Sequence, residues 1–273
     1  MTILVAEIGW NFIGKISLAK KMILSAKKSG ADYVKFQIWD PQFLKSGAWD
    51  NDGRRKIYEK AALSLEKYMH LKKYAKSIKI GCFASAFNIE GALLLKKTKD
   101  IWIKIPSHEA YNFDLIKFAY KNFKKTIISA GCLKKDELKK LIKFVKSKKN
   151  YKEKFLLLHC VSSYPLLAEN CNFEKFHFLK KNFEKVGYSG HYKGIEDAIY
   201  AVFNDSFLIE KHFTTDNKLP GRDNKFALNP IQFRELKEVV LLSKKFNRHM
   251  GLGLQKCERD IFKNYRGRWS KKG

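Results

Sequence analysis

Short apolar runs alternate along the chain with longer segments in which apolar residues recur with a helical period. Each run is rich in β-branched and aromatic residues and is four to six residues long, which predicts a strand. We expect eight strands: Ile3–Glu7, Tyr33–Gln37, Ile80–Ser85, Ile101–Ile105, Thr126–Ser129, Phe155–Cys160, Val186–Ser189 and Phe207–Lys211.

The longer segments predict helices. The first is expected over Leu18–Ser29, with Ser17 as its N-cap and Gly30 as its stop signal. Further helices are expected to begin near Asn112, Lys135, Asn172, Ile195 and Pro230.

Eight strands interleaved with helices imply parallel pairing through crossover helices, and eight strands are the number that closes a barrel. The alternative is a doubly wound open sheet. Neither a G-x-G-x-x-G after the first strand nor a P-loop is present, which disfavours a nucleotide-binding sheet. We therefore predict an α/β protein with one (β/α)8 TIM-barrel domain over residues 1–250. Residues 251–273 are expected to form a C-terminal tail that packs on the barrel or on a neighbouring subunit. The insertion from Pro41 to Tyr58 could lie over the site as a lid.

The formal net charge of +28 raises the possibility of nucleic-acid binding. Lysine doublets recur around the whole chain, however, and only eight of the 55 basic residues are arginine, the residue that reads bases in bidentate fashion. The pattern favours solvated helix faces, no nucleic-acid partner, and a surface that attracts anionic substrates.

The chain has five cysteines and no C-x-x-C pair, which disfavours both a disulfide framework and a structural zinc site. The chain starts almost directly with a strand-like run, which leaves no room for a signal peptide, and it has no apolar run long enough to span a membrane. We therefore expect a cytoplasmic protein without a membrane partner.

Polar residues gather at the carboxyl ends of the expected strands, where the active site of a barrel forms. They are Glu7, Lys35, Gln37, Ser85, Lys104, Ser107, Glu109, Ser129, the stretch His159–Tyr164, Ser189, His191, Glu210 and His212. Lys35 and Lys104 are flanked by apolar residues, so both need buried anionic partners. Two lysines with several hydroxyls suit a substrate that carries a phosphate and a carboxylate.

His191 and His212 are one βα unit apart, which puts them at the ends of neighbouring strands. Neighbouring strands lie about 5 Å apart, close enough for two imidazoles to hold one divalent metal. On this pattern alone, two ordinary core histidines are an equally good reading. A nucleophilic pair made by His159 and Cys160 is disfavoured because adjacent strand residues point to opposite faces.

Seven segments together resemble one family: AEIGWNFIG, GADYVKFQ, IKIPSHE, IISAG, LLHCVSSYP, GYSGH and EKHFTTDNKLPGRD. They are similar, in order and spacing, to the sialic acid synthase (N-acetylneuraminate synthase) family of phosphoenolpyruvate-condensing barrels. The resemblance covers residues 3 to about 240. It implies a transferase that joins phosphoenolpyruvate to an open-chain amino-hexose, releases phosphate by C–O cleavage, and makes a sialic-acid-like (nonulosonate) product for bacterial surface polysaccharide.

The resemblance also implies roles for individual residues. The residues matching the phosphoenolpyruvate pocket are Lys35, Ser85, Lys104, Ser107, Ser129 and Ser189. Those matching the ligands of a manganese or magnesium ion are His191 and His212, and those matching the sugar site are Gln37, Tyr164 and Asp223. Glu109, ahead of Glu7, would handle the proton of the attacking water, with Lys104 holding the anion beside it. A homodimer is expected.

The chain departs from the family pattern at several places. N-H-N-G becomes Asn11–Gly14, G-S-G-E becomes Pro106–Glu109, and S-D-H becomes Ser189–His191. These changes put the identity of the sugar in doubt. The family's C-terminal antifreeze-like domain, which supplies an arginine to a partner's site, has no counterpart here, so Arg266 or Arg268 of the tail is the candidate replacement in sugar binding.

Three alternatives stay open. A related synthase could join phosphoenolpyruvate to another aldose. An aldolase could form a Schiff base on Lys35 or Lys104. A barrel that has lost catalysis could act as a binding or scaffold protein.

Overall fold

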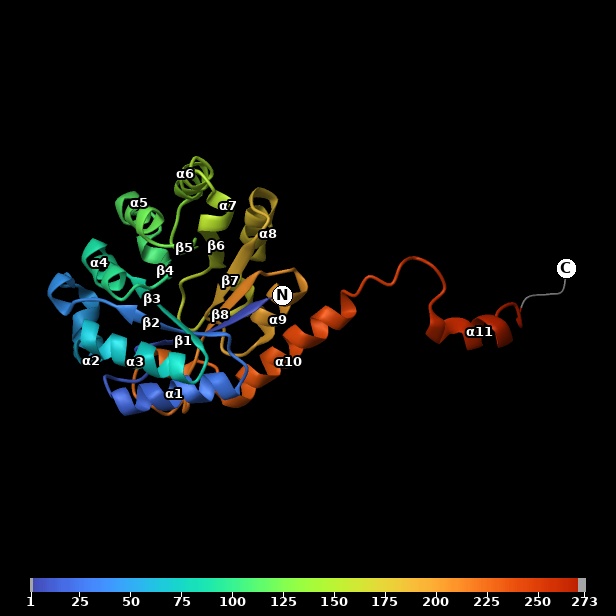
Figure 1. Cartoon of the computed structure of the whole chain (residues 1–273), viewed down its shortest axis with the longest axis horizontal. Helices are drawn as coiled ribbons and strands as arrows, with labels where there is room; N and C mark the ends of the chain where they lie inside the picture. The colour runs from blue at the N-terminus through green and yellow to red at the C-terminus, as the bar shows by residue number, and fades with distance from the viewer. Residues whose placement is uncertain (1, 270–273) are drawn as a thin grey trace.

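The computed structural model describes residues 2–269, and within that range eight parallel strands close into a barrel in chain order (Figure 1). The strands are β1 (Ile3–Gly9), β2 (Tyr33–Ile38), β3 (Gly81–Ala86), β4 (Trp102–Ile105), β5 (Lys125–Ser129), β6 (Phe155–Cys160), β7 (Val186–Gly190) and β8 (Leu208–His212). The predicted (β/α)8 barrel is confirmed, and every predicted strand lies within two residues of its observed bounds.

Helices surround the barrel. They are α1 (Ile16–Lys28), α2 (Arg54–Ala61), α3 (Leu65–Ser77), α4 (Ile89–Lys97), α5 (Phe113–Asn122), α6 (Lys135–Lys146), α7 (Tyr151–Lys154), α8 (Phe173–Asn182), α9 (Glu196–Phe203), α10 (Pro230–Phe246) and α11 (Arg259–Asn264). The expected N-cap Ser17 is wrong. A turn brings the Lys15 N–H to the Phe12 carbonyl, so the helix begins before Ser17 and Lys15 is its N-cap. Gly30 follows the helix with a φ of 90°, as its stop signal requires.

None of the described helices is long and apolar enough to cross a membrane.

The inside of the barrel has an apolar half and a polar half. Six buried side chains fill the half nearer the amino ends of the strands: Val5, Phe83, Ile127, Leu156, Leu158 and Leu208. On most strands the next inward-facing position toward the carboxyl end is polar, as at Glu7, Ser85 and Glu210, whereas on β6 it is Cys160. The larger apolar core lies between the strands and the helices. The interior of the barrel is therefore filled by apolar side chains at the amino ends of the strands and lined by polar side chains at their carboxyl ends.

The insertion after β2 includes two 3-10 turns, Pro41–Phe43 and Ala48–Asp52, and continues into α2. Tyr58 of α2 stacks on Trp10 with ring centroids 4.4 Å apart, and the Trp39 indole N–H donates to the Tyr58 carbonyl at 3.3 Å. Because Trp10 follows β1 directly, these contacts fix α2 near the carboxyl end of the barrel.

The C-terminal segment leaves the barrel at its other end. Ser243, Lys244 and Asn247 line a groove of about 420 Å³ with Ser206 and Phe207, which directly precede β8, so α10 ends beside the amino ends of the strands. Residues 247–269, called the tail below, are almost all exposed, and α11 stands apart from the barrel (Figure 1). The sequence predicts packing on the barrel or on a neighbouring subunit, and because residues 251–269 continue away from their own barrel after α10, the second alternative is the one that stays open. Residues 270–273 lie outside the described residues, and packing on a neighbouring subunit stays a prediction.

Candidate active site

Four charged side chains meet inside the barrel at its carboxyl end. Glu7 and Lys35 are opposite each other in the β1–β2 register, and their Oε1 and Nζ atoms are 2.8 Å apart. Lys104 Nζ donates to Glu210 Oε1 at 2.8 Å, and Lys35 Nζ is 3.7 Å from the same oxygen. All four side chains are buried. Lys35 and Lys104 thus have the buried anionic partners that the sequence requires.

Serine hydroxyls surround this charged cluster. Lys35 donates to the Ser85 hydroxyl at 2.8 Å, and Ser189, opposite Glu210 in the β7–β8 register, donates to Glu210 Oε1 at 3.1 Å. Ser129 ends β5 and is buried. Ser107 lies in the 3-10 turn after β4, where a Cβ on Gly131 would come within 2.5 Å of the Ser107 hydroxyl oxygen. The β5–α6 loop therefore needs glycine there to pack against Ser107.

The two carboxylates of the cluster differ in their affinity for protons. Burial raises the pKa of Glu7 to about 7, although Lys35 opposes the shift. Burial would also raise the pKa of Glu210, but Lys104 and Lys35 outweigh it, and the pKa falls to about 2. Glu210 therefore stays ionised, whereas Glu7 can gain or lose a proton near neutral pH.

Several polar atoms of the cluster have no hydrogen-bond partner among the described residues. They are Glu7 Oε2, Glu210 Oε2 and the Ser129 hydroxyl, all buried. Gln37 donates to Glu7 Oε1 at 2.5 Å, so only the second oxygen of that carboxylate is left over. Buried polar groups are rarely left unpaired, and their convergence in one place indicates a ligand site.

His191 follows β7 and His212 ends β8, with ring centroids 5.5 Å apart. The His191 Nδ1 is 2.8 Å from the Val161 carbonyl oxygen, which leaves its Nε2 for another partner. Burial lowers the pKa of His212 well below its usual value, so this ring is neutral, the form that binds metals. For His191, burial works in the same direction, but the negative charge of a Cys160 thiolate and the hydrogen bonds to Cys160 and the Val161 carbonyl outweigh it, and the pKa is raised.

The histidine pair fits a divalent metal in part. His212 Nδ1 is buried without a hydrogen-bond partner in the described chain and lies 3.6 Å from Asp223 Oδ2. Within residues 2–269 no group of three His, Cys, Asp or Glu side chains could hold a metal. The chain therefore supplies two imidazoles, and substrate or water atoms would complete the coordination of such an ion.

The residues expected to hold the sugar also line this end of the barrel. The Tyr164 ring lies 4.2 Å from the His191 ring between centroids, and Asp223 accepts a hydrogen bond from the Trp10 indole N–H. Gln37 contacts Glu7, as described above. Glu109 is less central: its described hydrogen bond is from Asn112 at 3.2 Å, and burial raises its pKa.

Arg266 and Arg268 are not brought to this site. Their guanidinium groups lie over the Phe262 and Tyr265 rings of the tail, 4.6 and 5.1 Å from the centroids. The tail departs from the opposite end of the barrel, so in the described chain neither arginine reaches the sugar site of its own subunit, and contact with the sugar site of a neighbouring subunit stays a prediction.

The structure adds site residues that the sequence did not single out. Glu210 was noted as a strand-end residue, but its place as the acceptor shared by Lys104 and Ser189 was missed. Arg222 donates to the Tyr164 carbonyl at 2.9 Å and lies over the Tyr164 ring. Cys160 Sγ is 4.0 Å from His191 Nδ1. For Glu210, the signal was available: strand alternation points it inward when Lys211 points outward.

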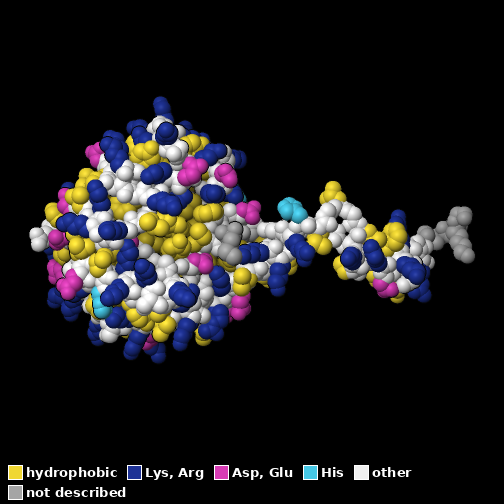
Figure 2. All heavy atoms as spheres, viewed as in Figure 1, with side chains coloured by type: hydrophobic (Ala, Val, Ile, Leu, Met, Phe, Trp, Pro, Cys, Tyr) yellow, Lys and Arg dark blue, Asp and Glu magenta, His cyan; other side chains and the backbone are white. Residues whose placement is uncertain are grey.

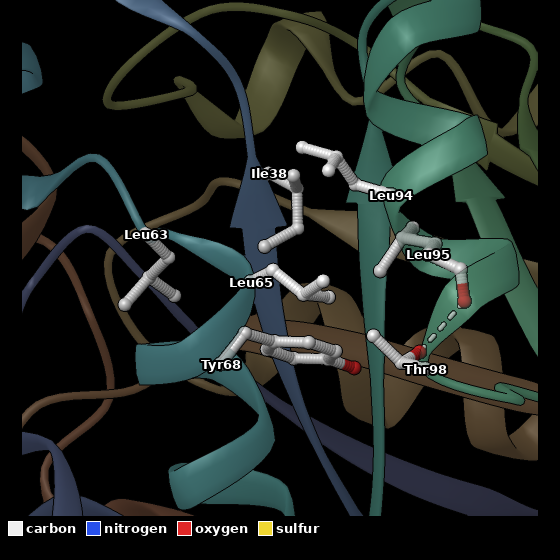
Figure 3. A pocket seen from close by; sticks show the side chains of 7 residues that line it. All are labelled: Ile38, Leu63, Leu65, Tyr68, Leu94, Leu95 and Thr98. Carbon is white, nitrogen blue, oxygen red and sulfur yellow. Dashed lines mark hydrogen bonds between the residues drawn. The ribbon is translucent and has the colours of Figure 1, made fainter.

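A second hollow, between α3 and α4, does not compete with this site. It is lined by Ile38, Leu63, Leu65, Tyr68, Leu94, Leu95 and Thr98 (Figure 3). It has no room for a water molecule, and its polar groups are satisfied, since Thr98 donates to the Leu95 carbonyl and Tyr68 to Asp100. This hollow is a packing defect.

Comparison with known proteins gives the relatives of the chain. It is 33% identical to the N,N'-diacetyllegionaminic acid synthase of Campylobacter jejuni over 96% of this chain and 81% of that protein. It is 32% identical to the pseudaminic acid synthase of the same organism, over 96% of this chain and 78% of that protein. The solved N-acetylneuraminic acid (sialic acid) synthetase of Leptospira borgpetersenii, crystallised with citrate, superposes with a TM-score of 0.85 at 29% identity, over 99% of this chain and 93% of that one. The NeuB family model matches residues 22–251, and the chain belongs to the NeuB family.

Proposed function

We propose that the protein is a nonulosonate synthase that condenses phosphoenolpyruvate with an open-chain amino-hexose and releases phosphate. The synthases among its relatives support the reaction class. The observation that carries the proposal is the pairing, in one buried layer, of a two-lysine cluster that has unpartnered oxygens with two adjacent histidines.

The lysine side would hold phosphoenolpyruvate. Lys35 and Lys104 place two cations beside the ionised Glu210, and two cations in one buried cluster favour a substrate that carries a phosphate and a carboxylate. The hydroxyl groups of the proposed pocket would complete the binding; they belong to Ser85, Ser107, Ser129 and Ser189. Glu210 keeps Lys104 and Ser189 in place before substrate arrives.

The histidine side would hold the sugar's aldehyde end. His191 and His212 would bind a divalent metal, as the general metal dependence of the family suggests. When bound, such an ion polarises a carbonyl oxygen and stabilises the negative charge that develops there. Gln37, Tyr164 and Asp223 lie where they could orient the rest of the sugar.

The chemistry then needs one proton acceptor. Carbon 3 of phosphoenolpyruvate bonds to the aldehyde carbon, whose oxygen takes up a proton from solvent water, and carbon 2 becomes cationic. Water adds to carbon 2 and loses its proton to a carboxylate, after which the C–O bond to phosphate breaks. Sequence favoured Glu109 as this base. The contacts favour Glu7, because it lies against Lys35 and its Oε2 is buried without a partner in the described chain, whereas Glu109 pairs with Asn112 and makes no described contact with either lysine.

The bond that breaks distinguishes this proposal from other reactions of phosphoenolpyruvate. With ¹⁸O in the bridging position, C–O cleavage leaves the label in the released phosphate, and mass spectrometry of that phosphate measures it. The assay contains manganese and a panel of amino-hexoses, with Lys104→Ala as the test variant and exposed Lys97→Ala as its matched control. Unlabelled phosphate, or label release equal in Lys104→Ala and Lys97→Ala, would exclude the assignment. The panel also decides between an amino-hexose and another aldose.

Borohydride trapping with substrate tests the aldolase alternative, because only an imine on Lys35 or Lys104 becomes a stable adduct. The homodimer and the cytoplasmic location remain predictions, and light scattering of the purified chain tests the first.

A further inference from the structure

Trp10 lies between the candidate sugar site and the insertion that follows β2. It comes directly after β1, is 5% exposed, and donates its indole N–H to the Asp223 carboxylate. The face of its ring stacks on the ring of Tyr58, which belongs to α2. One buried side chain therefore joins a residue expected to hold the sugar to the segment that covers this side of the barrel.

The main chain beside Asp223 is held without Trp10. The neighbouring residue Asn224 is fully buried and donates to the Asn11 carbonyl at 3.0 Å. Its side-chain oxygen accepts from the Thr214 hydroxyl at 2.6 Å. Because these bonds already join the loop after β1 to the loop after β8, the indole N–H of Trp10 is left to fix the side chain of Asp223.

The Asp223 carboxylate lies where its orientation matters. The oxygen that accepts from Trp10, Oδ2, is 3.6 Å from His212 Nδ1, so the carboxylate borders the histidine pair. A hydrogen bond to a carboxylate is stronger than one between neutral groups. A side chain that is oriented before the ligand arrives also loses less conformational freedom on binding. The indole N–H thus prepares Asp223 for a ligand beside His212.

Surface charge cannot supply the same selectivity. Lys and Arg side chains are spread over the face of the barrel seen in Figure 2, and such a surface attracts anions of many kinds. Sugar hydroxyl groups are neutral. Their selection therefore requires acceptors and donors that are held at fixed positions inside the site.

We propose that Trp10 is a positioning residue for the sugar substrate. Its indole N–H holds Asp223 in the orientation that accepts a hydrogen bond from a hydroxyl or amide N–H of the sugar, and its ring holds α2 beside the site. The role in sugar recognition rests on the proposed function. The link between Trp10 and Asp223 can be measured without any substrate.

Two variants with the same chemical change isolate this link. Trp10→Phe removes the N–H and keeps an aromatic ring against Tyr58. Trp39→Phe is the matched control, because it removes the indole N–H that donates to the Tyr58 carbonyl and leaves Asp223 untouched. Phosphate release is measured with manganese, phosphoenolpyruvate and an amino-hexose that the native chain uses.

Trp10→Phe should raise the KM for the sugar by about 10-fold to 100-fold, as expected for the loss of a hydrogen bond to a charged group. The KM for phosphoenolpyruvate and the melting temperature should stay nearly unchanged, which a general loss of structure would not allow. Trp39→Phe should change the KM for the sugar less than about threefold. Equal KM values for the sugar in the two variants would overturn the proposal.

Asp223→Ala tests whether Trp10 acts through Asp223. This variant should lower kcat/KM for the sugar at least as much as Trp10→Phe does. Adding Trp10→Phe to Asp223→Ala should then change kcat/KM less than about twofold, because the two residues share one effect. A full further loss in the double variant would show that Trp10 acts independently and would overturn the proposal.

Nitrogen-15 NMR of the indole groups tests the contact in the absence of substrate. Trp10→Phe identifies the Trp10 signal among those of the five tryptophans. Asp223→Ala should shift this signal and speed the exchange of its N–H with water. An unchanged signal would show that Trp10 does not hold Asp223. A native chain that releases no phosphate would refute the proposed function instead, and the indole signal would still decide the link between Trp10 and Asp223.

Discussion

Two lysine clusters lie on opposite sides of the barrel wall, and they are equally buried. Lys35 and Lys104 face the interior with exposures of 2% and 3%, and Lys211 faces the helices with 2%. Lys211 uses all three of its protons: it donates to the Tyr192 carbonyl and to both oxygens of Asp197 at 2.8–2.9 Å. The Asp197 carboxylate also accepts from Tyr188. In the outer cluster, around Lys211, every proton of the lysine is therefore donated to a protein acceptor.

The inner cluster is incomplete. Its carboxylates each leave one buried oxygen without a partner in the described structure, and the nearby Ser129 hydroxyl is also unpaired. Equally buried charged groups can therefore serve two roles. The ion pair of Lys211 and Asp197, whose lysine donates all its protons, stabilises the barrel wall, and the unpaired oxygens of Glu7 and Glu210 are available to a ligand.

The largest effect should come from the histidines beside the inner cluster. His191→Ala and His212→Ala should each lower kcat by about 1000-fold or more, since two imidazoles are the only metal ligands that the proposal assigns to the chain. Chelation with EDTA should do the same, and manganese or magnesium should reverse it. Steady-state kinetics and thermal melting check the claim together. Full activity in EDTA would end the metal role.

The outer cluster should respond in stability alone. Lys211→Met leaves Asp197 buried without its cation and should lower the free energy of unfolding by about 3–5 kcal/mol in urea titration. Lys211→Met combined with Asp197→Leu removes both charges and should recover most of that loss. If the single variant instead changes substrate kinetics at constant stability, the division between the two clusters is wrong.

Within the inner cluster, Lys104→Ala should act on phosphoenolpyruvate. Removing this cation should raise the KM for phosphoenolpyruvate by an amount equivalent to about 2–5 kcal/mol. The KM for the sugar and the melting temperature should change much less. Unchanged saturation by phosphoenolpyruvate would show that the anion site is elsewhere.

The smallest effect concerns pH. The pKa of Glu7 is about 7 in the folded chain against an ordinary 4.5, so the folded state binds the extra proton between these values. Glu7 therefore contributes stability that is present below pH 4.5 and is lost as the pH rises through 7. The difference in free energy of unfolding between the native chain and Glu7→Gln should fall by about 1–3 kcal/mol between pH 5 and 8. A flat difference would mean that Glu7 is ionised throughout.

The same contrast shows what sequence can reveal. Apolar flanking residues and strand-end position were enough to predict that Lys35 and Lys104 are buried with anionic partners. They could not identify Glu210 as the partner of Lys104, because that contact joins residues 106 positions apart across the barrel. Ser17 is not the N-cap because a local turn starts the helix earlier, with Lys15 as its N-cap. The direction of the tail depends on the position of the end of α10 in the folded chain. Local pattern gives the element and its face, and closure of the barrel decides which side chains meet.

The exit of α10 beside the amino ends of the strands also matters for engineering. A second enzyme or a solid support joined to the exposed segment after Phe246 would be attached at the amino ends of the strands, opposite the end that carries the candidate active site. Exposed segments of this kind tolerate inserted chain well. The barrel could therefore be immobilised in a flow reactor, or fused to the catalyst that consumes its product, without narrowing the path by which substrates arrive.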